Sequence, residues 1–239
     1  MTNQERVDQF VQDVYLVRFN KRLSSLTDNT GTEEVAKTLA FCRMFIKELE
    51  SERNPDGTPV DWSFARTNDN DFGVISSASQ IFELPDGVRR LVIDEDRPLV
   101  LMYDGSIITK FGVVEPNQIT RRRVDPSIED RVATVKRSLA FSRTFKDFEI
   151  GATVMADTIE DLPELSVSDV ELLDMVPYQL LVLGTAKNSV RPDIVQGGLA
   201  PSFIEQYADE LDKAIANNNA TTSGDSIVYE DLSGIGGVY

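Results

Sequence analysis

The chain contains no histidine, and its 239 residues include a single cysteine, Cys42. Histidine is the side chain most often used in general acid–base catalysis, and it is the commonest metal ligand. Its absence excludes Ser-His-Asp and Cys-His catalysis, as well as zinc sites that combine cysteine with histidine. One cysteine cannot form an internal disulfide, so nothing in the sequence requires an oxidising compartment. Cys42 lies in an apolar helical pattern, which predicts a small core side chain.

Long apolar runs are also missing. No segment approaches the length of a membrane span, and the first ten residues, MTNQERVDQF, lack the apolar stretch of a secretion signal. We therefore expect a soluble protein without a membrane partner. No glycine-rich loop of the P-loop or dinucleotide-binding type is present, because Gly234-Ile235-Gly236-Gly237 is followed by no helix. We expect no bound cofactor.

The charge is strongly one-sided. Lys and Arg number 24 against 40 Asp and Glu, which gives a formal charge of −16. Such a surface repels nucleic acid on average. Two interpretations of this acidic surface are open. It keeps the protein soluble, including in a salty habitat, or it forms a wall along which DNA slides without sticking. The one dense basic group is Arg121-Arg122-Arg123. It is a candidate for a phosphate contact, and the alternatives are a β-turn surface or an interface with an acidic neighbour.

Acidic clusters offer oxygen ligands for a hard cation, but none has the spacing of an EF-hand loop. The clusters are Asp69 with Asp71, Asp94-Glu95-Asp96, and Glu160-Asp161. We interpret them as solvated turn residues and predict no metal site and no catalytic residue. Trp62, the sole tryptophan, is expected to anchor the core between the first helices and the following sheet rather than to stack on a ligand.

Both ends of the chain have helical patterns. Thr2 and Glu5 fit a capping box, and apolar residues follow at helical spacing to about Leu26. Thr32 is the expected cap of a second helix, which stops before Asn54-Pro55 and pairs with the first as an antiparallel hairpin. Ser168 to Glu171 fits a further capping box. Pro177 should divide the helix that follows, and a last amphipathic helix begins near 201.

The middle of the chain has the pattern of β-hairpins. Residues 79–84 and 88–93 flank Pro85-Asp86-Gly87, and residues 99–103 and 106–111 flank Asp104-Gly105. From Asn217 the chain becomes rich in Asn, Ala, Thr, Ser and Gly, with spaced apolar residues that are typical of a segment that docks on a partner. These docking candidates are Ile227, Val228, Tyr229, Leu232, Ile235 and Tyr239.

The patterns together predict an α+β fold. In it, N- and C-terminal helical segments form a helical bundle, with a β-hairpin-rich middle and an extended C-terminal tail. The expected organisation has four segments. They are an N-terminal helical hairpin (1–54), a β-rich region (60–165), C-terminal helices that pack with the N-terminal pair (166–216) and a flexible docking tail (217–239).

This layout resembles the head-to-tail connector, or adaptor, proteins of tailed bacteriophages. The resemblance rests on the helical pair, Trp62, the segment Phe82 to Gly87, the entry Leu162-Pro163-Glu164-Leu165-Ser166 and the apolar helix after it. The large β-rich middle departs from the small, mostly helical connectors. The resemblance implies a ring of about a dozen copies below the portal, through which DNA passes, and no catalytic residues.

The resulting expectation is a structural virion protein that is not an enzyme. It would be assembled in the host cytoplasm, with itself, the portal protein, tail or nozzle proteins and passing DNA as partners. Three alternatives stay open: another tail or neck component, an acidic soluble binding protein such as a chaperone or DNA-mimic inhibitor, and a histidine-free carboxylate enzyme.

Overall fold

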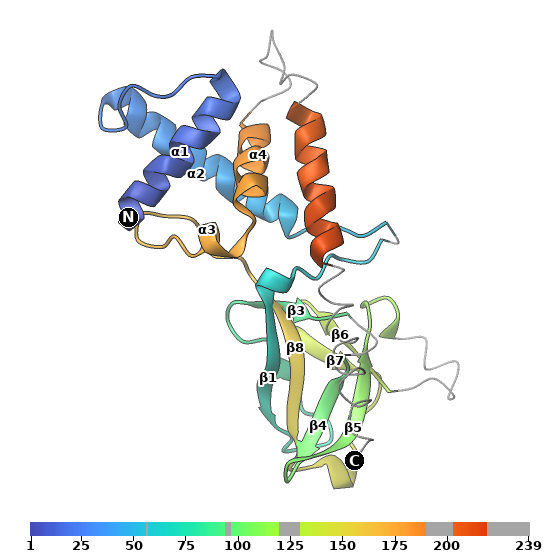
Figure 1. Ribbon diagram of the computed structural model, residues 1–239. Helices are drawn as coiled ribbons and strands as arrows, with labels where there is room; N and C mark the ends of the chain where they lie inside the picture. Colours follow the sequence, from blue (N-terminus) through green and yellow to red (C-terminus); the bar gives the residue numbers. More distant parts are fainter. Residues whose placement is uncertain (56, 94–96, 120–129, 190–202, 219–239) are drawn as a thin grey trace, which may run out of the picture. The chain divides into compact units, whose positions relative to one another are not determined.

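The computed structural model describes residues 1–55, 57–93, 97–119, 130–189 and 203–218. The chain divides into two compact units (Figure 1). The helical unit combines Met1–Phe64 with Leu162–Tyr239, and the sheet unit is Ala65–Asp161. The chain thus leaves the helical unit once, forms the sheet unit, and returns.

The first helix, α1, spans Asn3–Phe19, and the predicted capping box is confirmed. The side chain of Thr2 accepts from Glu5 N, and the Glu5 carboxylate accepts from Thr2 N. The predicted end near Leu26 is wrong, because Asn20 takes the left-handed conformation (φ 53°) and closes the helix. Asparagine is one of the few residues that tolerates this conformation at a helix end.

The second helix, α2, spans Asn29–Leu49 and begins earlier than expected. Asp28, not Thr32, is its N-cap, and the Asp28 Oδ1 atom accepts from Gly31 N at 2.7 Å. Thr32 instead lies in the first turn, where its hydroxyl donates to the Asp28 carbonyl at 2.9 Å. Gly31 is required here, since a Cβ atom at this position would overlap the backbone of Ser25 and Leu26.

Pro177 divides the next helical segment, as predicted. The short helix α3 is Leu172–Met175, and α4 is Tyr178–Asn188. The predicted capping box at Ser168 does not form, because α3 begins at Leu172 without a side-chain cap. Every residue from Leu180 to Ala186 is buried. A helix that is buried on all sides belongs in the interior of its unit, and α4 packs against both α1 and α2. A fifth helix covers 203–218.

The sheet unit contains an eight-stranded sheet that is nearly closed on itself. Its order is β1-β8-β4-β5-β6-β7-β2, with β3 also paired to β8. All pairs are antiparallel except β5 with β6. The strands are β1 Arg66–Val74, β2 Phe82–Glu83, β3 Val88–Leu91, β4 Leu99–Tyr103, β5 Ser106–Val113, β6 Arg131–Val135, β7 Ser138–Phe141 and β8 Thr153–Glu160.

One predicted hairpin forms and the other does not. Strands β4 and β5 pair across Asp104-Gly105, where both residues have positive φ (49° and 75°), as expected for an Asp-Gly turn. Strands β2 and β3 flank Pro85-Asp86-Gly87 but do not pair with each other, because β2 pairs with β7 and β3 with β8.

The expected fold class is therefore wrong. The structure is a mixed α/β fold with one large sheet, in which β8 pairs with β1, β3 and β4 from distant parts of the chain. The helices do not form the expected helical bundle. Figure 1 shows α1 and α2 crossing rather than running as an antiparallel hairpin. The physical reason is that α4 is buried on all sides. It is therefore surrounded by its neighbours, whereas a helix of the expected bundle would bury only one side.

The sheet unit has an aromatic core. Four phenylalanine rings meet edge to face, with centroid separations of 4.8–6.4 Å. Such contacts add roughly 0.5–1.5 kcal/mol each to the burial of the rings. The four rings are those of Phe82, Phe111, Phe141 and Phe145.

Candidate interaction surfaces

Two sets of residues singled out by sequence lie outside the described residues. They are the basic triplet Arg121-Arg122-Arg123 and the docking candidates Ile227, Val228, Tyr229, Leu232, Ile235 and Tyr239. The acidic run 94–96 lies outside them as well. Trp62 is described and belongs to the helical unit, where it is buried. Its Nε1 donates to the Leu49 carbonyl at 3.0 Å, and its ring stacks on Phe64.

Two of the described acidic candidates, Asp71 and Glu160, have carboxylates that accept hydrogen bonds from the protein itself. The Asp71 carboxylate accepts from Gly73 N at 2.7 Å, and Glu160 accepts from the Thr67 hydroxyl at 2.5 Å. Asp69 donates its backbone N–H to Asp157. Within the described part of the chain, no group of three or more acidic or cysteine side chains is arranged to hold a metal ion.

The strongest electrostatic feature is a buried ion pair in the sheet unit. Glu149 is fully buried, and Arg143 binds both of its oxygens, with Nη2–Oε1 at 2.6 Å and Nη1–Oε2 at 2.7 Å. Lys146 N and the Thr109 hydroxyl also donate to Glu149, at 2.7 and 2.8 Å. The Arg143 Nε atom donates to Asp130 at 2.7 Å. Every donor that Glu149 requires is therefore supplied by the chain.

This arrangement changes the pKa of Glu149. Burial alone would raise the pKa of this carboxyl, but the hydrogen bonds from Arg143, Lys146 N and Thr109 outweigh it and lower the pKa to about 2. The guanidinium of Arg143 also lies over the Phe111 ring, 4.9 Å from its centroid. Glu149 is therefore an ionised group locked in place, which suits a structural role and not proton transfer at neutral pH.

The sequence has an alternating pattern around Arg143, but this pattern does not identify the partner of Arg143. Leu139, Phe141, Arg143 and Phe145 share one face of that alternation, so an arginine among apolar residues was the available signal of a buried charge. β7 ends at Phe141, however, and the turn at Asp147–Glu149 brings Glu149 back to Arg143. A second pair, Arg66 with Asp157 at 2.6 Å, is similarly enclosed.

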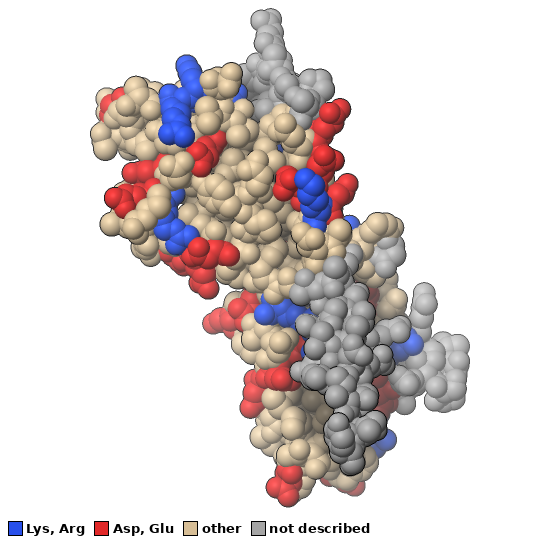
Figure 2. All heavy atoms as spheres, viewed as in Figure 1, with Lys and Arg blue, Asp and Glu red and all other residues tan. Residues whose placement is uncertain are grey.

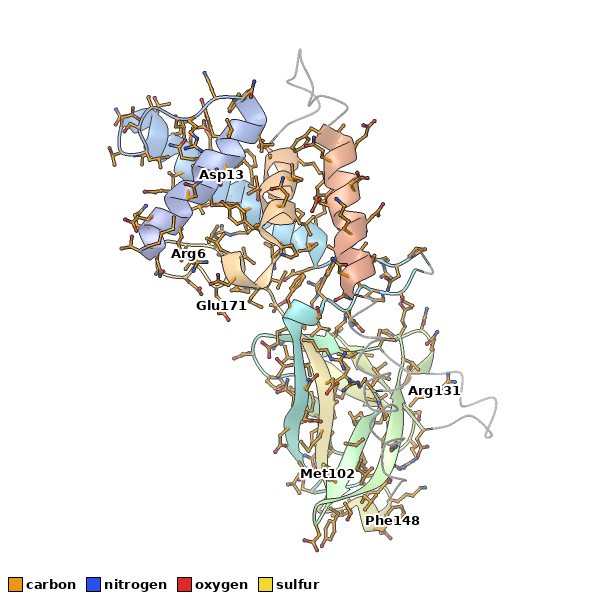
Figure 3. All side chains as sticks on the ribbon, in the orientation of Figure 1. Arg6, Asp13, Met102, Arg131, Phe148 and Glu171 are labelled. Atoms are coloured by element: carbon orange, nitrogen blue, oxygen red, sulfur yellow. The ribbon has the colours of Figure 1, made fainter. Side chains whose placement is uncertain are left out.

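An exposed apolar surface lies at one end of the sheet unit. We call it the apolar tip, and it consists of Val74, Tyr103, Ile107 and Phe148, each between 52% and 61% exposed. Val74 and Met102 both pair with Thr153, and Met102 also pairs with Ile107. Figure 3 shows Met102 and Phe148 at this end. Clusters of exposed apolar side chains mark sites where proteins interact.

The turn of Phe148 is joined to the rest of the tip by backbone contacts. Gly151 N donates to the Ile75 carbonyl at 2.8 Å, directly after Val74. Gly151 has φ of 93° and lies against the Tyr103 ring, 3.3 Å from where its Cβ would be. A side chain at Gly151 would disturb Tyr103. Backbone contacts therefore hold the turn of Phe148 next to the strands that supply the other residues of the apolar tip.

The helical unit contains an aromatic group, the α1–α2 aromatic cluster, in which Phe19 is exposed while Tyr15 and Phe41 are half-buried. It consists of Tyr15, Phe19 and Phe41, with Arg18 between them. The Tyr15 and Phe19 rings are 4.6 Å apart, and the Arg18 guanidinium lies 4.6 Å from the Phe19 ring and 5.8 Å from the Phe41 ring. Arg18 is held by Glu34 at 3.1 Å. Phe19 is an exposed aromatic residue that lies outside the core.

Negative charge is concentrated in the helical unit. Its two chain segments hold 11 Lys and Arg against 23 Asp and Glu, a net −12, whereas the sheet unit holds 13 against 17, a net −4. Acidic side chains follow the outer side of the helix 203–218 (Figure 2). Of the helices described, none is long and apolar enough to cross a membrane.

The described residues show two features that bear on function. Their enclosed carboxylates are neutralised by arginines, and their exposed apolar residues gather on each unit. Comparison with models of protein families gives no match, and neither does comparison with curated proteins.

Proposed function

We propose that the chain is a structural virion protein, a head-to-tail adaptor that forms a ring between portal and tail. The observation that carries the proposal is that both units expose apolar side chains, through the apolar tip on the sheet unit and through Phe19 of the α1–α2 aromatic cluster on the helical unit. A part that joins several neighbours needs more than one such surface. The order of segments that resembles phage adaptors supplies the class of neighbour.

The charge supports the same function. A ring around a DNA channel must let a polyanion pass without retaining it, and a net −12 on the helical unit opposes phosphate binding. The ion pairs Arg143–Glu149 and Arg66–Asp157 neutralise the enclosed carboxylates Glu149 and Asp157 of the sheet unit, which suits a structural role for these residues. The proposed partners are further copies of the chain, the portal protein and tail proteins.

The test is co-sedimentation of the full chain with portal particles and with isolated tails. We expect the wild-type chain to bind both. Replacing Ile107 and Phe148 by serine removes two of the four apolar side chains of the tip and should weaken binding to one of the two partners by at least about tenfold, as for loss of a buried anchor. Val167→Ser, a change at an exposed apolar residue of the helical unit, is the matched control.

Two results would contradict the proposal. A chain that stays a monomer or dimer and joins neither particle behaves as an acidic soluble binding protein. A tip variant that binds portal and tail as tightly as the control shows that the apolar tip contacts neither.

A further inference from the structure

The outer faces of two helices in the helical unit carry opposite charge at the same spacing. On α2, exposed residues follow at i, i+4, i+7 and i+11: Ala36, Ala40, Arg43 and Lys47. We call this the basic face. On the helix 203–218, exposed residues follow at the same intervals: Glu205, Asp209, Asp212 and Ala216. We call this the acidic face.

Residues at these intervals lie on one side of a helix. The opposite side of α2 is buried through Thr38, Cys42, Phe45 and Leu49. The opposite side of the helix 203–218 is buried through Phe203 and Tyr207. The Tyr207 ring meets that of Phe45 edge to face at 6.3 Å. Both charged faces therefore point away from the interior of their own unit.

We infer that the basic face of one copy binds the acidic face of the next copy, with the two helices antiparallel. In that arrangement Lys47 meets Glu205, Arg43 meets Asp209, Ala40 meets Asp212 and Ala36 meets Ala216. Small side chains at one end let the two backbones approach, and two ion pairs form at the other end. The contact joins two different faces, so repeating it around an axis can close a ring.

The basic face is an exception in its unit. Arg43 and Lys47 have side chains that are 58% and 66% exposed in a unit of net −12. Their present partners within the chain are Glu164 at 2.8 Å and Glu50 at 3.3 Å. The Arg43–Glu164 pair is exposed on both sides, so it is worth little and a neighbouring helix can replace it, whereas Lys47 keeps the buried Glu50 as a partner beside any new one. Charge complementarity between two patches also selects the partner and its register.

The inference deepens the proposed function and rests on it for the ring, but its test does not need a portal. Two double variants of the full chain reverse one face each: R43E with K47E, and E205K with D209K. Self-association is measured by sedimentation at low ionic strength up to about 1 mM, which detects even weak contacts. E83K with D86K, on the sheet unit, makes the same change of net charge as the second variant and is the control.

We expect the wild type and the control to self-associate, and added salt to weaken the contact because exposed charges are screened. Each face-reversed variant alone should associate at least about tenfold more weakly, because like charges then meet. An equimolar mixture of the two variants should associate again. In the mixture, each reversed face meets an oppositely charged face on the other variant.

Three results would overturn the inference. They are a wild type that stays monomeric throughout, variants that associate as well as the control, and weakened variants whose mixture does not recover. Recovery in the mixture also shows that both variants are folded. A chain that joins portal particles but fails this test keeps the proposed function and loses the inferred contact. A chain that passes this test but joins no portal particle keeps the inferred contact and loses the proposed function.

Discussion

The ion pair between Arg143 and Glu149 predicts how acid destabilises the sheet unit. The pKa of Glu149 falls from an ordinary value of 4.5 to about 2 on folding. At about 1.4 kcal/mol per pKa unit, this difference contributes about 3 kcal/mol to the free energy of unfolding. Because the pKa is lower in the folded state, the contribution is complete above pH 4.5. It is lost as the pH falls through about 2.

The perturbation is Glu149→Gln, which keeps the size of the side chain and removes its charge. At pH 7 the variant should lose about 3 kcal/mol of unfolding free energy, within the range for breaking a buried pair. At pH 2 the wild-type carboxyl is about half protonated in the folded protein and almost fully protonated in the unfolded one, so most of the difference between the two proteins should disappear. Asp147→Asn, in the same turn but exposed, should change stability by less than about 0.5 kcal/mol.

The assay must report on the sheet unit. Trp62 lies in the helical unit, so its fluorescence does not follow β8. Hydrogen exchange of amides in β8 measures the opening free energy of the strand that pairs with β1, β3 and β4. A loss below about 1 kcal/mol at pH 7, or a loss of the same size at pH 7 and pH 2, would refute the reasoning.

Three further outcomes follow from the helical unit. Gly184→Ala should lower the unfolding free energy by about 1–3 kcal/mol in urea titrations followed by Trp62 fluorescence, because a Cβ atom there would overlap the Phe45 ring. This cost exceeds the gain of about 1 kcal/mol from better helix propensity. Cys42 should not react with a thiol reagent at pH 8 until the protein unfolds, because burial raises its pKa to about 12. Trp62→Phe should cost about 1 kcal/mol in thermal unfolding through loss of the indole hydrogen bond to Leu49.

Each of these predictions has a control or a contradicting result. Gly112→Ala, in strand β5 of the sheet unit, is the control for the Gly-to-Ala change itself, since a Cβ at Gly112 meets only Asp130 O at 3.9 Å. Its stability is measured by hydrogen exchange in the sheet unit instead of Trp62 fluorescence. A Gly184→Ala protein as stable as wild type would contradict the packing of α4 against α2. Labelling of native Cys42 at the rate of the unfolded chain would contradict its burial. A Trp62→Phe variant with unchanged melting would show that the indole bond is replaced.

Local signals in the sequence predicted local structure well. The capping box at Thr2, the division of the helix at Pro177 and the Asp104-Gly105 hairpin all form, because each depends on residues within a few positions of one another. The error in the predicted start of α2 is also local, a shift of the N-cap from Thr32 to Asp28. Asp28 and Thr32 are both good capping residues, and the close packing of Gly31 against Ser25 and Leu26 places the helix start at the earlier one.

Pairing between distant segments could not be predicted in this way. Val88 to Leu91 has a sound strand pattern, but nothing in it specifies β8, some 70 residues later, as its partner instead of β2. The buried pair Arg143–Glu149 could not be predicted for a related reason, because the two residues meet only through the turn that follows β7. The apolar tip was missed because Val74, Tyr103, Ile107 and Phe148 come from three strands and a turn that only the closed sheet brings together.

The most direct test of the proposed adaptor function is imaging of the full chain by electron microscopy, alone and after mixing with portal particles. We predict closed rings that stack on the portal and share its axis. Particles that stay bare while the chain remains a monomer or dimer would contradict the account.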